Sequence, residues 1–107
     1  MHILHLSSAK TWRGGEQQIA YLIEELRLLE IKQSVFCVEN GAFTTWCEQN
    51  EVVHETYQKH SSFDPKIAKQ LKRLVKNQQI THIHAHDSHA HTYAFLAVVL
   101  FLSLIHI

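Results

Sequence analysis

Five of the ten histidines in this 107-residue chain lie within one ten-residue segment, HIHAHDSHAH at 82–91. An imidazole can bind a metal ion, exchange a proton near neutral pH, or hydrogen-bond to a sugar or phosphate oxygen. His82, His84 and His86 alternate with small or apolar residues, so in a β-strand all three would face the same side. The segment is therefore the first place to look for chemistry.

Four roles remain open for these histidines: a structural metal site, a catalytic His-x-His metal centre, packed or solvated side chains without a role, and contact with a sugar or phosphate. Alternate strand positions are about 7 Å apart, whereas zinc needs three or four convergent ligands. In a following helix, His89 and His91 would not share a face. We therefore expect no bound metal and favour a ligand-contacting role for His86, Asp87 and His89 at the end of the strand.

A second candidate is the segment WRGGEQ, with adjacent glycines Gly14 and Gly15. Without Cβ atoms the backbone can approach a phosphate closely, and the helix that follows would offer free N–H groups and its positive dipole end. Arg13 could add a charge-assisted contact. The alternative is that the glycines only form a tight turn into a helix. The dinucleotide fingerprint G-x-G-x-x-G is absent, which argues against a nicotinamide or flavin enzyme.

Hydrophobic periodicity predicts strands and helices in alternation. Ile19, Leu22, Ile23, Leu26 and Leu29 would form the inner face of the first helix. Asp64 and Pro65 are a strong helix start, a side-chain cap followed by proline at the first helical position. The predicted elements are a strand at 2–7, a helix at 16–30, a strand within 31–38, a short helix at 42–49, a strand at 51–56, a helix from 64–65 to about 78, a strand at 80–86 and a helix from 88 onward.

This order, β-α-β-α-β-α-β-α, indicates an α/β fold with a Rossmann-like, doubly wound parallel sheet in one domain over residues 1–107. Ligands of open parallel sheets bind beyond the carboxyl ends of the strands, near the point where strand order reverses. WRGGEQ follows the first strand and HDSHAH follows the fourth. We expect both loops to line one crevice.

Two stretches resemble GT-B glycosyltransferases of family 4. MHILHLSSAKTWRGGEQQIAYLIEELRLL is similar to the opening strand, glycine-pair loop and helix of that family, and QITHIHAHDSHAH resembles its later hydrophobic segment ending in H-A-H-D/N. Both lie in the family's order and at its separation. Three positions depart from the pattern: Thr81 stands where the family often has Asp, His82 where it often has an apolar residue, and His2 where Lys is common.

The resemblance implies the N-terminal, acceptor-side half of a retaining enzyme that moves a sugar from a nucleotide-sugar donor to a glycan or lipid-linked acceptor. Arg13, Gly14, Gly15 and Glu16 would contact the donor, while His86, Asp87 and His89 would serve the transferred sugar or acceptor. No cofactor or metal is implied. We expect a fragment that is inactive alone, because the donor-binding C-terminal domain is absent. The apolar stretch 98–107 departs from the family pattern, which leaves open whether it belongs to the native protein.

Charge and targeting signals set further bounds. Ten basic and ten acidic residues cancel, so general attraction to nucleic acid is not expected. Two cysteines and the lack of a signal-peptide pattern favour a reducing, cytoplasmic location. The apolar run 93–102 is too short to span a bilayer and predicts a buried helix. Five basic residues on the helix after Pro65 predict a solvated face or, alternatively, peripheral contact with anionic lipid at the inner face of the membrane: Lys66, Lys69, Lys72, Arg73 and Lys76.

Two other functions compete with sugar transfer. A metal-dependent hydrolase could use the His-x-His pair, although such folds usually carry it on the first strand and here it follows three strand–helix units. A non-catalytic α/β binding domain of the response-regulator type would need acidic residues at the end of the first strand, where HILHLSS has none.

Overall fold

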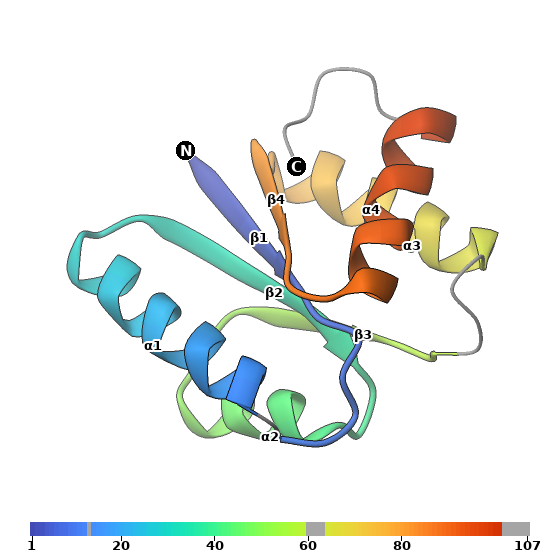
Figure 1. Cartoon of the computed structure of the whole chain (residues 1–107). Helices are drawn as coiled ribbons and strands as arrows, with labels where there is room; N and C mark the ends of the chain where they lie inside the picture. Colours follow the sequence, from blue (N-terminus) through green and yellow to red (C-terminus); the bar gives the residue numbers. More distant parts are fainter. Residues whose placement is uncertain (13, 60–63, 102–107) are drawn as a thin grey trace.

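Four parallel strands form one sheet with two helices on each face (Figure 1). The structure, a computed structural model, describes residues 1–12, 14–59 and 64–101. In chain order the elements are β1 (His2–Leu6), α1 (Gly14–Leu28), β2 (Lys32–Val38), α2 (Ala42–Gln49), β3 (His54–Tyr57), α3 (Pro65–Gln78), β4 (His82–Ala85) and α4 (Ser88–Phe101). The predicted alternation and the Rossmann-like α/β class are confirmed.

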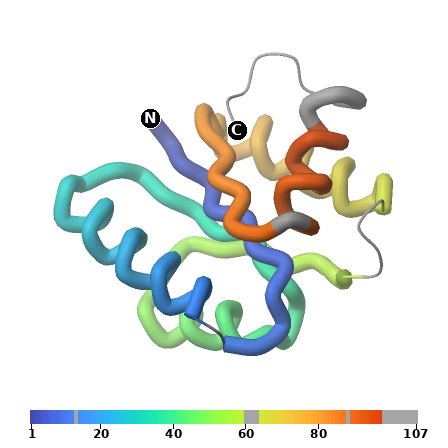
Figure 2. Tube along the Cα trace, viewed as in Figure 1, coloured from blue at the N-terminus to red at the C-terminus, as the bar shows by residue number. Residues whose placement is uncertain are grey.

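The strands lie in the order β3-β2-β1-β4. β1 therefore pairs with β2 on one side and with β4 on the other, and the chain reverses its direction of travel across the sheet between these neighbours. Figure 2 shows the N-terminal strand running beside a segment about 80 residues later in the sequence. In this pairing His5 is the register partner of His84, and Leu6 is the partner of Ala85. The loops after β1 and β4, which contain the two predicted segments, consequently leave the sheet side by side at the carboxyl ends of the strands.

One face of the sheet is covered by α3 and α4. Leu4 and Leu6 of β1 and Phe36 of β2 point to this side, and each is fully buried. They pack against Leu71 of α3 and Tyr93 of α4 in a continuous apolar cluster. Because strand residues alternate, the apolar positions of β1 that face these helices are two apart.

The opposite face is covered by α1 and α2. Ile19 and Ile23 of α1 pack with Val35 and Cys37 of β2 and with Phe43 of α2 in a second, smaller cluster. Both cysteines of the chain are buried and free, and Thr44 Oγ1 donates a hydrogen bond of 3.0 Å to the Cys37 sulfur. The second cluster is centred on β2, whereas the first also reaches β4 through Ile83.

Helix α3 begins and ends where its sequence predicts. The Asp64 carboxylate accepts a hydrogen bond of 2.9 Å from the Lys66 N–H, and Pro65 occupies the first helical position. The C-cap residue Gln79 adopts the left-handed conformation with φ of 55°, and its N–H bonds back to carbonyls of the last turn. Among the helices that the structure describes, none combines the length and apolar character needed to cross a bilayer.

Three boundary predictions were wrong. Helix α1 begins at Gly14, so the glycine pair forms its first turn. It ends at Leu28, which leaves Leu29 70% exposed and outside the expected inner face, because Glu30 at φ of 58° turns the chain toward β2. β3 begins at His54 because Glu51 has φ of 54° and the Val52 N–H still bonds to the carbonyl of Cys47 in α2.

Candidate functional site

A cleft of about 610 Å³ opens at the carboxyl ends of β1 and β4. Gly15 and Glu16 of the first turn of α1 form part of its lining, together with His86, Asp87 and His89 from the β4–α4 tip. The two segments singled out in the sequence thus face each other across one space. Gly14 is not among the residues that line this cleft, and Arg13 lies outside the described residues. The structure thus brings the two predicted segments together, and the role of each residue in them stays a prediction.

Asp87 ties the two walls of the cleft together. Its carboxylate accepts a hydrogen bond of 2.8 Å from the Ser8 N–H and another from the Ser8 hydroxyl, and it caps α4 by accepting 2.8 Å from the Ala90 N–H. Burial by itself would raise the pKa of Asp87, but these hydrogen bonds and the nearby Lys59 ammonium outweigh it and lower the pKa. The carboxylate is therefore held ionised between the β1–α1 loop and the first turn of α4.

The β1–α1 loop is also held from the side of β3. The Tyr57 hydroxyl donates 2.8 Å to the carbonyl of Ser7, and the Lys59 ammonium donates 2.9 Å to the carbonyl of Ser8. A third contact comes from the start of α2, where the Ala42 N–H donates a hydrogen bond of 3.1 Å to the carbonyl of Lys10. A loop anchored at three points presents a fixed wall to a ligand.

The glycine pair is not required by the chain's own packing. A Cβ built on Gly14 or on Gly15 would meet no heavy atom within 4 Å, and neither residue has a positive φ. A tight turn therefore does not explain the choice of glycine here. What the missing side chains do provide is free space above the first turn of α1, whose N–H groups have no partner within the helix.

Glu16 is the buried acid of the cleft wall. Its side chain is only 4% exposed, and among the described residues its Oε1 is the one buried side-chain oxygen without a hydrogen-bond partner. A buried polar atom left unpaired costs free energy comparable to a lost hydrogen bond. Because Glu16 lines the cleft, a hydroxyl or amine of a bound molecule is positioned to supply that partner.

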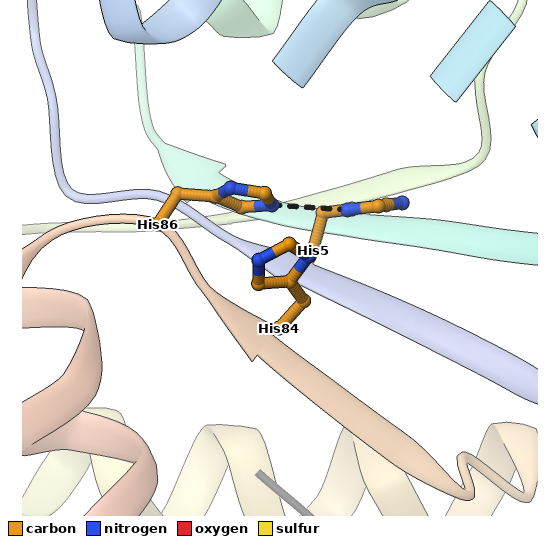
Figure 3. Close-up of side chains that lie close together, drawn as sticks. All are labelled: His5, His84 and His86. Carbon is orange, nitrogen blue, oxygen red and sulfur yellow. Dashed lines mark hydrogen bonds between the residues drawn. The ribbon is translucent and has the colours of Figure 1, made fainter. Parts of the chain in front are cut away.

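Three imidazoles, those of His5, His84 and His86, lie close together, as Figure 3 shows, and His86 lines the cleft. His5 Nδ1 lies 3.0 Å from His86 Nε2, and the rings of His84 and His86 have centroids 3.9 Å apart. Burial lowers the pKa of His5 to about 4, with His84 adding to the effect against the hydrogen bond with Gln33. Burial, with His84 and His5, lowers the pKa of His86 to about 3 although Asp87 opposes it. Both imidazoles are thus neutral at physiological pH.

Sequence reasoning missed the contributions of Ser8, Lys59 and His5. Ser8 and Lys59 hold loop backbone, and their roles depend on which strand ends are adjacent in space. His5 faces the same side of the sheet as His84 because β1 and β4 are register partners, far apart in the sequence. Trp12 of the β1–α1 loop stacks on Phe43 of α2, with centroids 5.8 Å apart.

No protein-family model matches the sequence, and no curated protein sequence matches it. Solved structures do match. A glycosyltransferase from Rickettsia africae ESF-5 has a TM-score of 0.78 at 16% identity, over 98% of this chain and 28% of that one. MurG from Acinetobacter baumannii gives 0.75 at 11% identity, over 98% and 33%. Anabaena Alr3699/HepE in complex with UDP gives 0.72 at 22% identity, over 94% and 27%.

The chain has the fold of a GT-B glycosyltransferase domain. It spans a third or less of the length of these three structures. At such low identity the likeness concerns the fold, which agrees with the sheet order and with the position of the cleft at the switch point between β1 and β4. In this fold, residues from the β1–α1 and β4–α4 connections form the candidate site.

Proposed function

We propose that this chain is the N-terminal, acceptor-side domain of a retaining glycosyltransferase that transfers a sugar from a nucleotide-sugar donor to a glycan or lipid-linked acceptor. The observation that carries the proposal is the shared cleft between the first turn of α1 and the β4–α4 tip. The fold supports it, and so does the Anabaena structure, which is a complex with UDP. A second domain, outside this chain, would complete the donor site.

The first turn of α1 is suited to the phosphates of such a donor. Free N–H groups at a helix N-terminus and the positive end of its dipole attract anions, and Gly15 leaves the backbone open to close approach. We assign Arg13, Gly14 and Gly15 to the donor diphosphate on this basis. Glu16 carries the same sign of charge as a phosphate, so we assign its unpaired Oε1 to a hydroxyl of the donor's sugar.

The β4–α4 tip is assigned to the sugar being transferred and to the acceptor. His89 is exposed on the first turn of α4 and lines the cleft, so its ring is free to contact a hydroxyl. His86 is partly buried and its ring is neutral, which lets it hydrogen-bond to a sugar without adding charge. Asp87 acts by position, because both of its oxygens are engaged by Ser8 and Ala90.

Sugar transfer by the complete polypeptide that contains this chain tests the proposal. The protein is incubated with UDP-glucose and other nucleotide sugars, release of the nucleoside diphosphate is followed, and the anomeric configuration of the product is read by NMR. We expect retention, and we expect Gly15→Val to lower kcat/KM by roughly tenfold or more because its side chain displaces the diphosphate. Glu25→Gln, on the exposed face of α1, is the matched control and should be unaffected.

The outer face of α3 supports a second part of the proposal, peripheral contact with the cytoplasmic face of the membrane. Lys66, Lys69, Arg73 and Lys76 are exposed, opposite a fully apolar inner face. Basic side chains near an anionic lipid surface contribute about 1 kcal/mol each. This contact would place the domain at the membrane surface that holds a lipid-linked acceptor.

A further inference from the structure

The three histidines beside the cleft form a group whose nitrogen atoms converge. One ring nitrogen each of His5, His84 and His86 can be chosen so that all three lie within 4.8 Å of one another. His84 lies in β4 and His86 follows its last residue, where the His86 N–H still bonds to the carbonyl of Leu6, so the two side chains point to the same side of the sheet. The parallel register places His5 of β1 directly beside His84. Figure 3 shows the rings turned toward one another on the same side of the sheet.

Gln33 fixes which nitrogen of His5 is available. The Gln33 amide nitrogen donates 2.9 Å to the carbonyl of Ile23 in α1, so its oxygen must face His5. That oxygen lies 2.8 Å from His5 Nε2, which therefore carries the proton. Nδ1 is left as a lone pair directed at His86. Metal-binding histidines in proteins commonly donate their other ring N–H to an oxygen acceptor that fixes the tautomer, and the Gln33 oxygen provides such an acceptor for His5.

The distances are close to those that a tetrahedral ion requires. Zinc–nitrogen bonds of about 2.1 Å separate two ligand atoms by roughly 3.4 Å. His5 Nδ1 and His86 Nε2 are 3.0 Å apart. His84 is exposed, so its ring can rotate to bring its nitrogen closer to those of His5 and His86. The exposed side also leaves room for water as a fourth ligand.

We propose that His5, His84 and His86 bind one divalent transition-metal ion of the zinc type at the β1–β4 edge of the cleft. Imidazole ligands select zinc, cobalt and nickel over magnesium and calcium, which prefer oxygen. The sequence analysis expected no bound metal, because it considered only the histidines within 82–91. The third ligand, His5, comes from β1. It does not depend on the proposed transferase activity, because the ligands and their support all belong to this chain.

Metal titration of the untagged 107-residue chain, first dialysed against EDTA, tests the site. Isothermal titration with Zn²⁺ should show one ion per chain, Co²⁺ should give the visible absorbance of a tetrahedral nitrogen site, and Mg²⁺ should not bind. His84→Asn is the main variant, because an exposed side chain can be changed without loss of the fold, which circular dichroism verifies. We expect it to weaken Zn²⁺ binding by about 100-fold, because loss of a residue that only supports a metal ligand already costs roughly ten- to 100-fold.

Two further variants separate a built site from adventitious binding to surface histidines. Gln33→Met removes the oxygen that sets the His5 tautomer and should weaken Zn²⁺ binding roughly tenfold. His91→Asn changes an exposed histidine of α4 outside the group and should leave binding unchanged. Absence of Zn²⁺ binding by the wild-type chain overturns the proposal. Equal loss in His84→Asn and His91→Asn, or no loss in His84→Asn, does so as well.

Discussion

The two faces of the sheet are built from different kinds of residue. Under α3 and α4 the strands contribute mainly apolar side chains, in a cluster that extends from Phe36 to Ile83. The buried polar residues His2 and Ser34 of these strands bond to each other and to Gln78 at the end of α3. Under α1 and α2 the apolar cluster is centred on β2, and toward β4 it gives way to Gln33 and three histidines. β4 itself is apolar on the first face and exposes His84 on the second.

The face under α3 and α4 mainly stabilises the fold, whereas the face under α1 and α2 carries the residues that could do chemistry. Close-packed apolar residues hold the sheet from one side and can do so without polar partners. On the other side the buried imidazole of His5 is satisfied by a specific neighbour, Gln33, which fixes its ring orientation beside the cleft. Substitutions on the first face should therefore change folding, and those on the second should change ionisation and binding.

The largest effect is expected at Leu6, which is fully buried against α3 and α4. Leu6→Ala should lower the free energy of unfolding by about 3 kcal/mol through lost apolar contacts and a residual cavity. His84→Ala, on the exposed side of β4, should change it by less than about 0.5 kcal/mol. Urea denaturation measures both. Similar losses for the two variants would contradict the separation of the faces.

The next effect is a loss of stability in acid, from His5 and His86. Unfolding releases both imidazoles to a pKa near 6.5, whereas the folded values are about 4 and about 3. The unfolded chain therefore binds more protons below pH 6.5, so stability is complete above that pH and falls as the pH decreases. Between about pH 7.5 and about pH 5.8 the free energy of unfolding should fall by roughly 2 kcal/mol in EDTA, about half of it from each imidazole.

His5→Gln should reduce this pH dependence, because one of the two depressed imidazoles is removed. Urea midpoints at both pH values give the comparison. A midpoint that does not change with pH in the wild-type chain would show that these rings are not held neutral by burial.

A smaller effect is expected at the contact between the two walls of the cleft. Asp87→Ala removes the cap of α4 and both hydrogen bonds to Ser8, and should cost about 1–2 kcal/mol. Native-state hydrogen exchange should locate the change in the β1–α1 loop and the first turn of α4. Protection that falls uniformly over the sheet, with those segments unaltered, would be the opposite result.

The smallest effect on folding is expected on the outer face of α3. Replacing both Lys69 and Arg73 by Glu should leave the free energy of unfolding, measured by urea denaturation, within about 0.5 kcal/mol of wild type, since both side chains are exposed. The same change should abolish sedimentation with anionic phosphatidylserine vesicles at low salt, if that face contacts membranes. Neutral phosphatidylcholine vesicles are the control. Wild-type protein that stays in the supernatant with both lipids would refute the membrane contact.

Local signals predicted much of the fold, and long-range pairing accounts for what they missed. Helix α3 followed from Asp64 and Pro65, whose capping chemistry is contained in neighbouring residues. The meeting of WRGGEQ and HDSHAH followed from the rule for parallel sheets. Leu29 was misplaced because the helix stops one residue earlier, which periodicity does not encode. The role of His5 was missed because only the β1–β4 register places it beside His84.

Chemical-shift mapping of the isotope-labelled complete polypeptide that contains this chain, titrated with UDP-glucose, tests the central claim most directly, that the first turn of α1 and the β4–α4 tip form one binding site. We predict that the amide signals of Gly15, Glu16, Asp87 and His89 shift together and saturate with a single affinity. Signals of α3, on the far face, should stay in place. Shifts confined to one of the two walls, or no shifts at either wall, would contradict the account.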